Sequence, residues 1–156
     1  MKVEITYPEL FQAASVGVMR TVTALKRGAN GKYGATRDAG WQIDVVGCIG
    51  ELAVAKMLDM FWSGAVGTFV PGDVGEYEVR ATTNQRNTHM LLHEGDADEA
   101  LFYLVIPTAN PLVVDVHGPI HARDGKQERF WKTLNGRSAF WVPKSEVDAL
   151  QVRMAA

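Results

Sequence analysis

Three carboxylates and one cation stand in an order that would suit metal-assisted chemistry on a phosphate. Glu51 lies in an apolar run with helical spacing, and Asp73 closes a Pro-Gly-Asp turn. Glu78 precedes Arg80 by two residues in a segment with the alternation of a strand. Because residues two apart on a strand share a face, Glu78 and Arg80 are predicted to project together. If the three acids converge, their oxygens form a site for a hard divalent cation.

Hydrolysis of a phosphodiester requires a polarised phosphorus, an activated water and a stabilised leaving oxygen, and one or two Mg²⁺ (or Mn²⁺) ions can supply all three. These ions take oxygen ligands, so Asp73 and Glu78 are expected to bind the metal directly, with the carbonyl of Val79 as a further ligand. Glu51 is expected to bind it directly, through water or at a second metal position. Arg80 would neutralise charge on the phosphate, which makes Asp73, Glu78 and Arg80 the predicted catalytic residues.

The spacing of apolar residues predicts the helices that carry or flank these side chains. One helix is expected over 8–26 and a second over 38–60. Gly47 and Gly50 interrupt the second helix at about 1 kcal/mol each, which predicts a close approach to a sheet or to a substrate backbone. A tight reversal after this helix would set Asp73 beside the glutamates across a hairpin.

The rest of the chain is rich in strand signals. Strands are expected over 66–70, 76–82, 88–93, 100–106, 112–116 and 140–142, with a short helix over 121–133 and a last helix over 143–150. The almost wholly apolar segment 100–106 suits a central strand that is buried on both faces. Asp96, Asp98 and Glu99 precede it and are expected in a solvated turn. The sequence therefore predicts a single α/β (α+β) domain over 1–156, built as a central mixed β-sheet flanked by helices.

The composition limits the classes of protein to which the chain can belong. Its 156 residues are 47% apolar and carry a net charge of −2, which fits a globular domain and excludes a strongly basic nucleic-acid coat. The single cysteine, Cys48, cannot form an internal disulfide or a zinc cage and is expected in the core. The sequence shows no secretion signal and no apolar run of about 20 residues, so we expect a cytoplasmic protein without a membrane partner.

A nucleic-acid partner would need a local basic patch, because the chain as a whole is slightly acidic. Five cations and no acids occur from Arg20 to Arg37, in a region rich in glycine. Two polar residues follow the motif strand and are placed to reach a nucleic-acid backbone. The predicted nucleic-acid contacts are Lys26, Arg27, Lys32, Arg37, Thr82 and Gln85. A solvated loop and ordinary strand-end polarity are the alternative interpretations of these residues.

The order of the motifs resembles that of the PD-(D/E)XK nuclease superfamily. Members of this superfamily combine a helix-flanked mixed sheet with an Asp at a turn and a (D/E)-x-K motif on the following strand. Many also place a Glu on the helix before the hairpin. The matching residues are Glu51 in G-E-L-A, Asp73 in P-G-D-V-G and Glu78 in E-V-R, with Arg80 in the place of the lysine.

The resemblance covers roughly residues 40–106, between the helix over 8–26 and a C-terminal strand and helix over 139–150. It implies a nuclease-like fold, DNA as the substrate and dependence on Mg²⁺ or Mn²⁺. It also implies that a small domain of this type would form a homodimer in order to cut both strands. The chain is further similar to small phage-encoded proteins, which implies a place in the host cytoplasm.

Arg80 departs from the superfamily pattern, and the departure leaves three interpretations open. An arginine stabilises negative charge but stays protonated, so it cannot act as a base and a metal-bound water would supply the hydroxide. Alternatively, the fold has lost catalysis and binds DNA or a host protein. In the third interpretation, the acids are surface residues of an unrelated α+β domain. Glu76 shares a face with Glu78 and competes for its role.

Overall fold

The structure is a computed structural model that describes residues 1–28, 37–67, 72–83, 88–134 and 136–152. In chain order its elements are β1 (Lys2–Glu4), α1 (Tyr7–Lys26), α2 (Arg37–Met57), β2 (Tyr77–Ala81), β3 (His89–Leu92), β4 (Leu101–Pro107), β5 (Val113–His121), α3 (Ala122–Gly125), the 3₁₀ turn η1 (Glu128–Phe130), β6 (Trp131–Leu134), β7 (Arg137–Pro143) and α4 (Lys144–Leu150).

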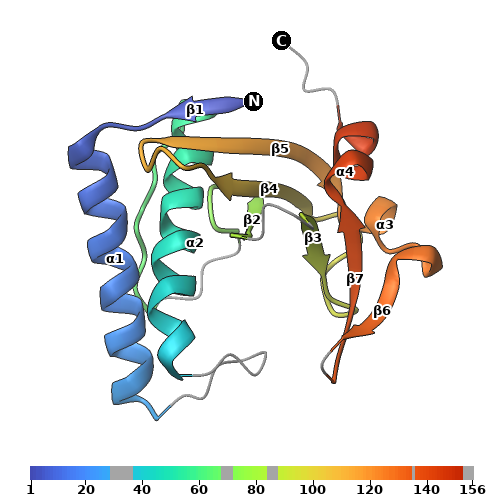
Figure 1. The fold of residues 1–156 in the computed structure, drawn as a ribbon, viewed down its shortest axis with the longest axis horizontal. Helices are drawn as coiled ribbons and strands as arrows, with labels where there is room; N and C mark the ends of the chain where they lie inside the picture. Colours follow the sequence, from blue (N-terminus) through green and yellow to red (C-terminus); the bar gives the residue numbers. More distant parts are fainter. Residues whose placement is uncertain (29–36, 68–71, 84–87, 135, 153–156) are drawn as a thin grey trace.

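The described strands form two sheets, which together with the helices give an α+β fold. The first sheet has the order β1-β5-β4-β2 and is mixed, because β2 runs parallel to β4 while the other pairs are antiparallel. The second sheet is antiparallel and has the order β3-β7-β6. Figure 1 shows α1 and α2 on one side of the molecule and the second sheet on the other. The α+β class is confirmed, but the strands are divided between two sheets instead of one central sheet.

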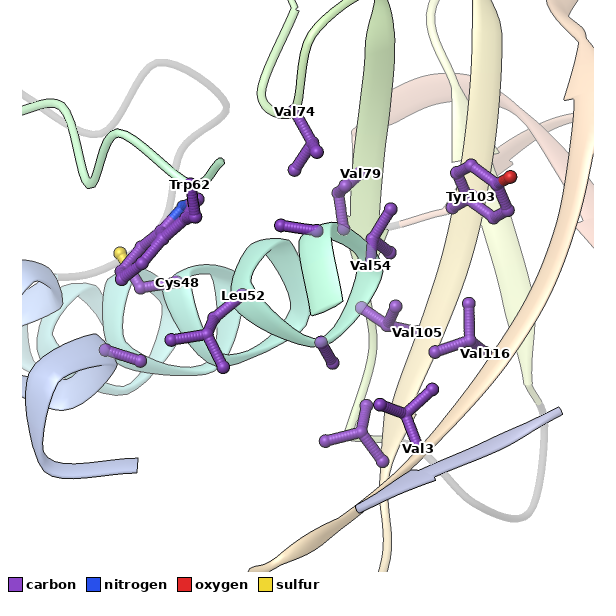
Figure 2. Close-up of a cluster of buried hydrophobic side chains, with 14 of the residues drawn as sticks. Val3, Cys48, Leu52, Val54, Trp62, Val74, Val79, Tyr103, Val105 and Val116 are labelled. Atoms are coloured by element: carbon purple, nitrogen blue, oxygen red, sulfur yellow. The ribbon is translucent and has the colours of Figure 1, made fainter. Parts of the chain in front are cut away.

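The division into two sheets follows from β4, which has apolar side chains on both faces. Tyr103 and Val105 belong to the core that packs against α2, whereas Phe102, Leu104 and Ile106 belong to a core shared with the second sheet. All five are at most 7% exposed, which confirms the predicted central strand. Figure 2 shows the first core, where α2 and its neighbours contribute Cys48, Leu52, Val54, Trp62, Val79 and Val116. Because both faces of β4 are apolar, each must be covered by another layer. Helix α2 covers the first face, and β3 and β7, in a separate sheet, cover the second.

Glycines set how closely the helices approach their neighbours. A Cβ on Gly17 of α1 would lie 2.5 Å from the backbone of Val45, so α1 and α2 pack with their backbones close together. A Cβ on Gly50 would lie 2.4 Å from a methyl group of Val105, which confirms the predicted close approach of α2 to the sheet. Gly47 has no described atom within 4 Å of that position. No helix in the described part of the chain has the length and apolar character that a membrane crossing needs.

The second helix ends at Met57, three residues before the predicted boundary. Asp59 adopts a left-handed backbone with φ of 53°, and the N–H of Met60 donates to the carbonyl of Ala55 at 2.9 Å. The N–H of Asp59 also donates to the carbonyl of Lys56 at 3.3 Å. These two hydrogen bonds form a Schellman C-cap. Aspartate tolerates this backbone better than most residues, so a glycine is not needed. The usual sequence signal for the end of a helix, a glycine, is therefore missing here.

Other boundaries differ from the prediction in the C-terminal half. β5 continues to His121 instead of stopping near 116, because a register shift opposite Gly118 lets the strand pass the Gly-Pro pair. The helix expected over 121–133 is therefore replaced by α3, η1 and the start of β6. The last helix is confirmed as α4. Residues 68–70 of the strand expected over 66–70 lie outside the described residues.

Candidate functional site

A tight turn before β2 fixes the position of Asp73. Val74 and Tyr77 form an isolated antiparallel bridge, and the N–H of Asp73 donates to the carbonyl of Tyr77 at 2.8 Å. The turn needs Gly72 at φ of 79°, where a Cβ would lie 2.2 Å from the carbonyl oxygen of Gly75. The Oδ2 atom of Asp73 then accepts a hydrogen bond from the N–H of Val79 at 2.8 Å. The carboxylate is thus held against the strand that follows it.

Glu78 and Arg80 project from the same face of β2, as predicted. Tyr77 and Val79 are buried, and Val79 lies toward α2, 3.5 Å from the position of a Cβ on Gly50. The side chains of Glu78 and Arg80 are 32% and 28% exposed, and their charged atoms are 3.8 Å apart. Alternation along the strand therefore turns the acid and the cation away from α2.

Asp73 and Glu78 interact electrostatically, and this coupling marks them as a pair. Burial raises the pKa of Glu78 above its usual value, and the negative charge of Asp73 raises it further. The guanidinium of Arg80 and a backbone hydrogen bond from Gly72 act in the opposite direction, while Asp96 adds to the rise. A bound cation would relieve the effect of Asp73 on the charge of Glu78.

Glu51 has a different environment from the other two acids. Its side chain is buried and forms a two-pronged ion pair with Arg20 of α1, with N–O distances of 2.5 and 2.9 Å. The indole N–H of Trp62 donates to the same carboxylate at 3.0 Å, and Arg20 also donates to the carbonyl of Ala65 at 2.9 Å. Glu51 thus joins α1, α2 and the segment after α2. No local pattern around Glu51 indicated this contact, because Arg20 lies on another helix.

The donor set decides which kind of metal site the chain can offer. Among the described residues, no group of three His, Cys, Asp or Glu side chains is arranged to hold a metal ion. The oxygens of Glu51 already receive three hydrogen bonds from Arg20 and Trp62. Direct binding of an ion by Glu51 would therefore compete with the hydrogen bonds from Arg20 and Trp62, and the role of Glu51 at a metal stays a prediction. Asp73 and Glu78 offer two carboxylates, and Mg²⁺ is usually held by one or two carboxylates and retains several waters.

Arg80 has partners that the sequence did not indicate. Its guanidinium lies 3.2 Å from the carboxylate of Asp96 and 4.8 Å from the ring centre of Phe102. Asp96 was expected in a solvated turn, but its side chain is only 13% exposed and also accepts from the N–H of His93 at 2.8 Å. Burial lowers the pKa of His93, and Arg80 lowers it further, whereas Asp96 raises it. The cluster therefore contains Glu78, Arg80, Asp96 and His93.

A large cleft opens beside this cluster. It has a volume of about 1710 Å³ and lies between the first half of α2, the end of β2 and the second sheet. Arg80 and His93 line one part of its wall, Ile43 and Gly47 another, and Trp141 a third. Concave sites with a few converging polar groups are where ligands most often bind. The cleft and the adjoining face of β2 are therefore the candidate site.

The predicted nucleic-acid contacts do not form one described patch. Lys26 is exposed at the end of α1, but the guanidinium of Arg27 lies against Gly67. Thr82 donates through its backbone N–H to Val105 at 3.1 Å and has further interactions. The remaining three contacts, Lys32, Gln85 and the side chain of Arg37, lie outside the described residues.

Comparisons of the chain with protein-family models, curated proteins and solved structures gave no match. The resemblance to PD-(D/E)XK nucleases therefore stays a prediction that rests on a few residues.

Proposed function

We propose that the chain is a metal-dependent phosphodiesterase that acts on DNA, with a fold and site of the PD-(D/E)XK type. The observation that supports this proposal is the position of Asp73 beside β2, where its carboxylate accepts from the N–H of Val79 at 2.8 Å and its charge raises the pKa of the neighbouring Glu78. Arg80 lies next to Glu78 and lines the large cleft, whereas the two acids lie outside the lining of that cleft. Two coupled carboxylates offer a position for Mg²⁺ or Mn²⁺, and an adjacent arginine offers a partner for a phosphate oxygen.

Each residue would have a separate task. Asp73 and Glu78 would hold the ion, with the carbonyl of Val79 as a further oxygen; when bound, the ion supplies Lewis-acid polarisation of the phosphodiester. Asp73 keeps its place because its Oδ2 atom is tied to the N–H of Val79. Arg80 would balance the charge of the phosphate but cannot remove a proton from water. Glu51 would hold α1 against α2 through its ion pair with Arg20.

The proposal is tested by a DNA-cleavage assay with duplex and single-stranded substrates in Mg²⁺, in Mn²⁺ and in a chelator. Asp73→Asn removes the charge but retains an oxygen that can accept from Val79, and Glu78→Gln is the matching change on β2. Loss of a direct ligand should exceed the roughly 10–100-fold loss that outer-shell partners cause. Glu76→Gln is the matched control, because Glu76 is exposed two residues before Glu78.

The assay has a clear contradictory result. Cleavage that survives Asp73→Asn and Glu78→Gln unchanged would remove both residues from the site. Cleavage that is lost in Glu76→Gln but kept in Glu78→Gln would show that Glu76, and not Glu78, binds the metal.

A second candidate function is DNA binding without cleavage, and the contacts of Arg80 favour it. The arginine replaces the motif lysine, and its guanidinium is already engaged by Asp96, Glu78 and the ring of Phe102. A fold that retained only binding would show metal-independent association with DNA that weakens as salt increases. Binding of this kind, with no product in either Mg²⁺ or Mn²⁺, would select this function over hydrolysis.

A further inference from the structure

The outer face of α1 is apolar and exposed along the whole helix. Tyr7 and Phe11 are 73% and 76% exposed, and Val18 and Leu25 are 40% and 42% exposed. Their separations of four, seven and seven residues place them on one side of a helix with about 3.6 residues per turn. We refer to these four side chains as the outer face of α1. Figure 1 shows α1 at the edge of the molecule, with α2 between it and the strands.

This face also lacks charge, which is unusual for an exposed helix. The charged residues of α1 are Glu9, Arg20 and Lys26. Glu9 pairs with Lys56 of α2 at 2.8 Å, and Arg20 pairs with Glu51, so both are directed to the rest of the chain. Only Lys26, at the C-terminal end, remains exposed. Surfaces that are rich in aromatic residues and poor in charge are typical of the centre of protein interfaces.

The fold makes little use of the two aromatic side chains of this face, Tyr7 and Phe11, which are mostly exposed. The inner side of α1 packs through Ala13, Gly17 and Thr21, which are buried against α2. A capping box between Thr6 and Glu9 already stabilises the start of the helix. The exposed parts of these aromatic side chains therefore contribute little to the stability of a single chain. Burying them against a partner would lower the free energy.

We infer that the outer face of α1 binds the same face of a second copy of this chain, with the two helices antiparallel about a two-fold axis. A two-fold interface pairs a surface with itself, so an uncharged apolar strip is complementary to its own copy. The antiparallel arrangement places Tyr7 opposite Leu25 of the second copy, which sets a large side chain against a smaller one. It also places the start of each helix, which follows Glu4 of β1 by three residues, near Lys26 of the other copy.

A parallel arrangement is less favourable on electrostatic grounds. It would bring the two Lys26 side chains together and would align the two helix dipoles, whereas the antiparallel arrangement opposes the dipoles and separates the like charges. A partner of unlike sequence is not required, because each end of the strip finds its complement on the second copy.

The exposed aromatic side chains of this face supply about half of the area that a stable dimer needs. Aromatic side chains bury about 150–250 Å² each, so the exposed part of Tyr7 and Phe11 offers roughly 150 Å² per residue. The four aromatic residues of a dimer thus supply roughly 600 Å², about half of the 1,200 Å² at the lower limit of stable interfaces. Val18 and Leu25 of both chains, which lie on the same face, supply further area.

Sedimentation velocity of the full chain, at about 1–100 µM, tests the association. The expected species has twice the 17.1 kDa mass of the chain. Phe11→Glu should raise the dimer Kd by at least about tenfold, because a charge would be buried in the centre of the strip. Phe61→Glu is the matched control, since Phe61 is 89% exposed but lies outside α1. Circular dichroism melting of both variants establishes that they are folded.

Cross-linking tests the direction of the helices. With a rise of 1.5 Å per residue and the axis near the middle of the strip, two copies of residue 18 are displaced by about 6 Å along the helices and two copies of residue 7 by about 27 Å. A short bismaleimide should therefore link Val18→Cys but not Tyr7→Cys. Cys48 does not interfere, because burial raises its pKa to about 12 and removes it from solvent.

A chain that stays monomeric over the whole concentration range would overturn the proposal. So would a dimer that Phe11→Glu leaves intact, or one that only Phe61→Glu disrupts. Equal cross-linking at positions 7 and 18 would show a parallel pair and contradict the antiparallel arrangement. These results do not depend on DNA cleavage, so the interface and the proposed function can fail separately.

Discussion

Removing the carboxylate of Glu51 should destabilise the fold instead of acting on a metal. In Glu51→Ala, the guanidinium of Arg20 loses two oxygens at 2.5 and 2.9 Å, and the indole of Trp62 loses its acceptor at 3.0 Å. Breaking a buried ion pair costs about 3–5 kcal/mol, and the lower end applies because the Arg20 side chain is 27% exposed. A loss of about 3 kcal/mol lowers Tm by about 6–12 °C in a chain of this length.

Urea denaturation of the wild type, Glu51→Ala and Arg20→Met measures the free energy of unfolding directly. A double variant, Arg20→Met with Glu51→Leu, should lose much less than the sum of the single changes, because it leaves no buried charge without a partner. Glu128→Ala, at an exposed acid, is the control and should change stability by less than about 0.5 kcal/mol. If Glu51→Ala unfolds like the wild type but abolishes metal binding, then Glu51 is a ligand and the structural role assigned to it is refuted.

Further predictions concern α2 and β2. Gly47→Ala should stabilise the chain by up to about 1 kcal/mol because the added methyl group meets no described atom, whereas Gly50→Ala should destabilise it because the methyl group would meet Val105; urea denaturation measures both. Burial and the charge of Asp73 raise the pKa of Glu78, so the folded chain binds this proton more tightly than the unfolded chain. Stability from this group is therefore highest below the unfolded pKa and falls as pH rises through the folded pKa, and Glu78→Gln should flatten that part of the pH–stability profile.

Local patterns in the sequence were enough to predict which faces are buried. The helix over 8–26 begins one residue earlier, at Tyr7, and its N-terminus is capped by the Thr6–Glu9 capping box. The apolar run of β4 predicted burial on both faces, and two-residue spacing placed Glu78 beside Arg80. These features depend on side chains within a few positions of one another, where periodicity fixes direction.

The partners of those faces could not be predicted in the same way. Glu51 has the spacing of an ordinary helix acid, and only the packing of α1 on α2 brings Arg20 to it. Asp96 reaches Arg80 from the loop before β4, although its acidic neighbours suggested a solvated turn. β3 pairs with β7, which lies much later in the chain, and so the number of sheets was wrong. Contacts between residues far apart in the chain depend on how all the elements pack together, and a short motif carries no information about that packing.

The central claim is that Asp73 and Glu78 together hold one divalent cation. It is tested most directly by the Tm of the wild type, Asp73→Asn and Glu78→Gln with and without millimolar Mn²⁺ or Mg²⁺. A cation that binds only the folded chain raises its stability by about 2.7 kcal/mol at 100 times Kd, so the wild-type Tm should rise, and neither variant should show the rise. A wild-type Tm that metal leaves unchanged, or an equal rise in all three proteins, would contradict the claim.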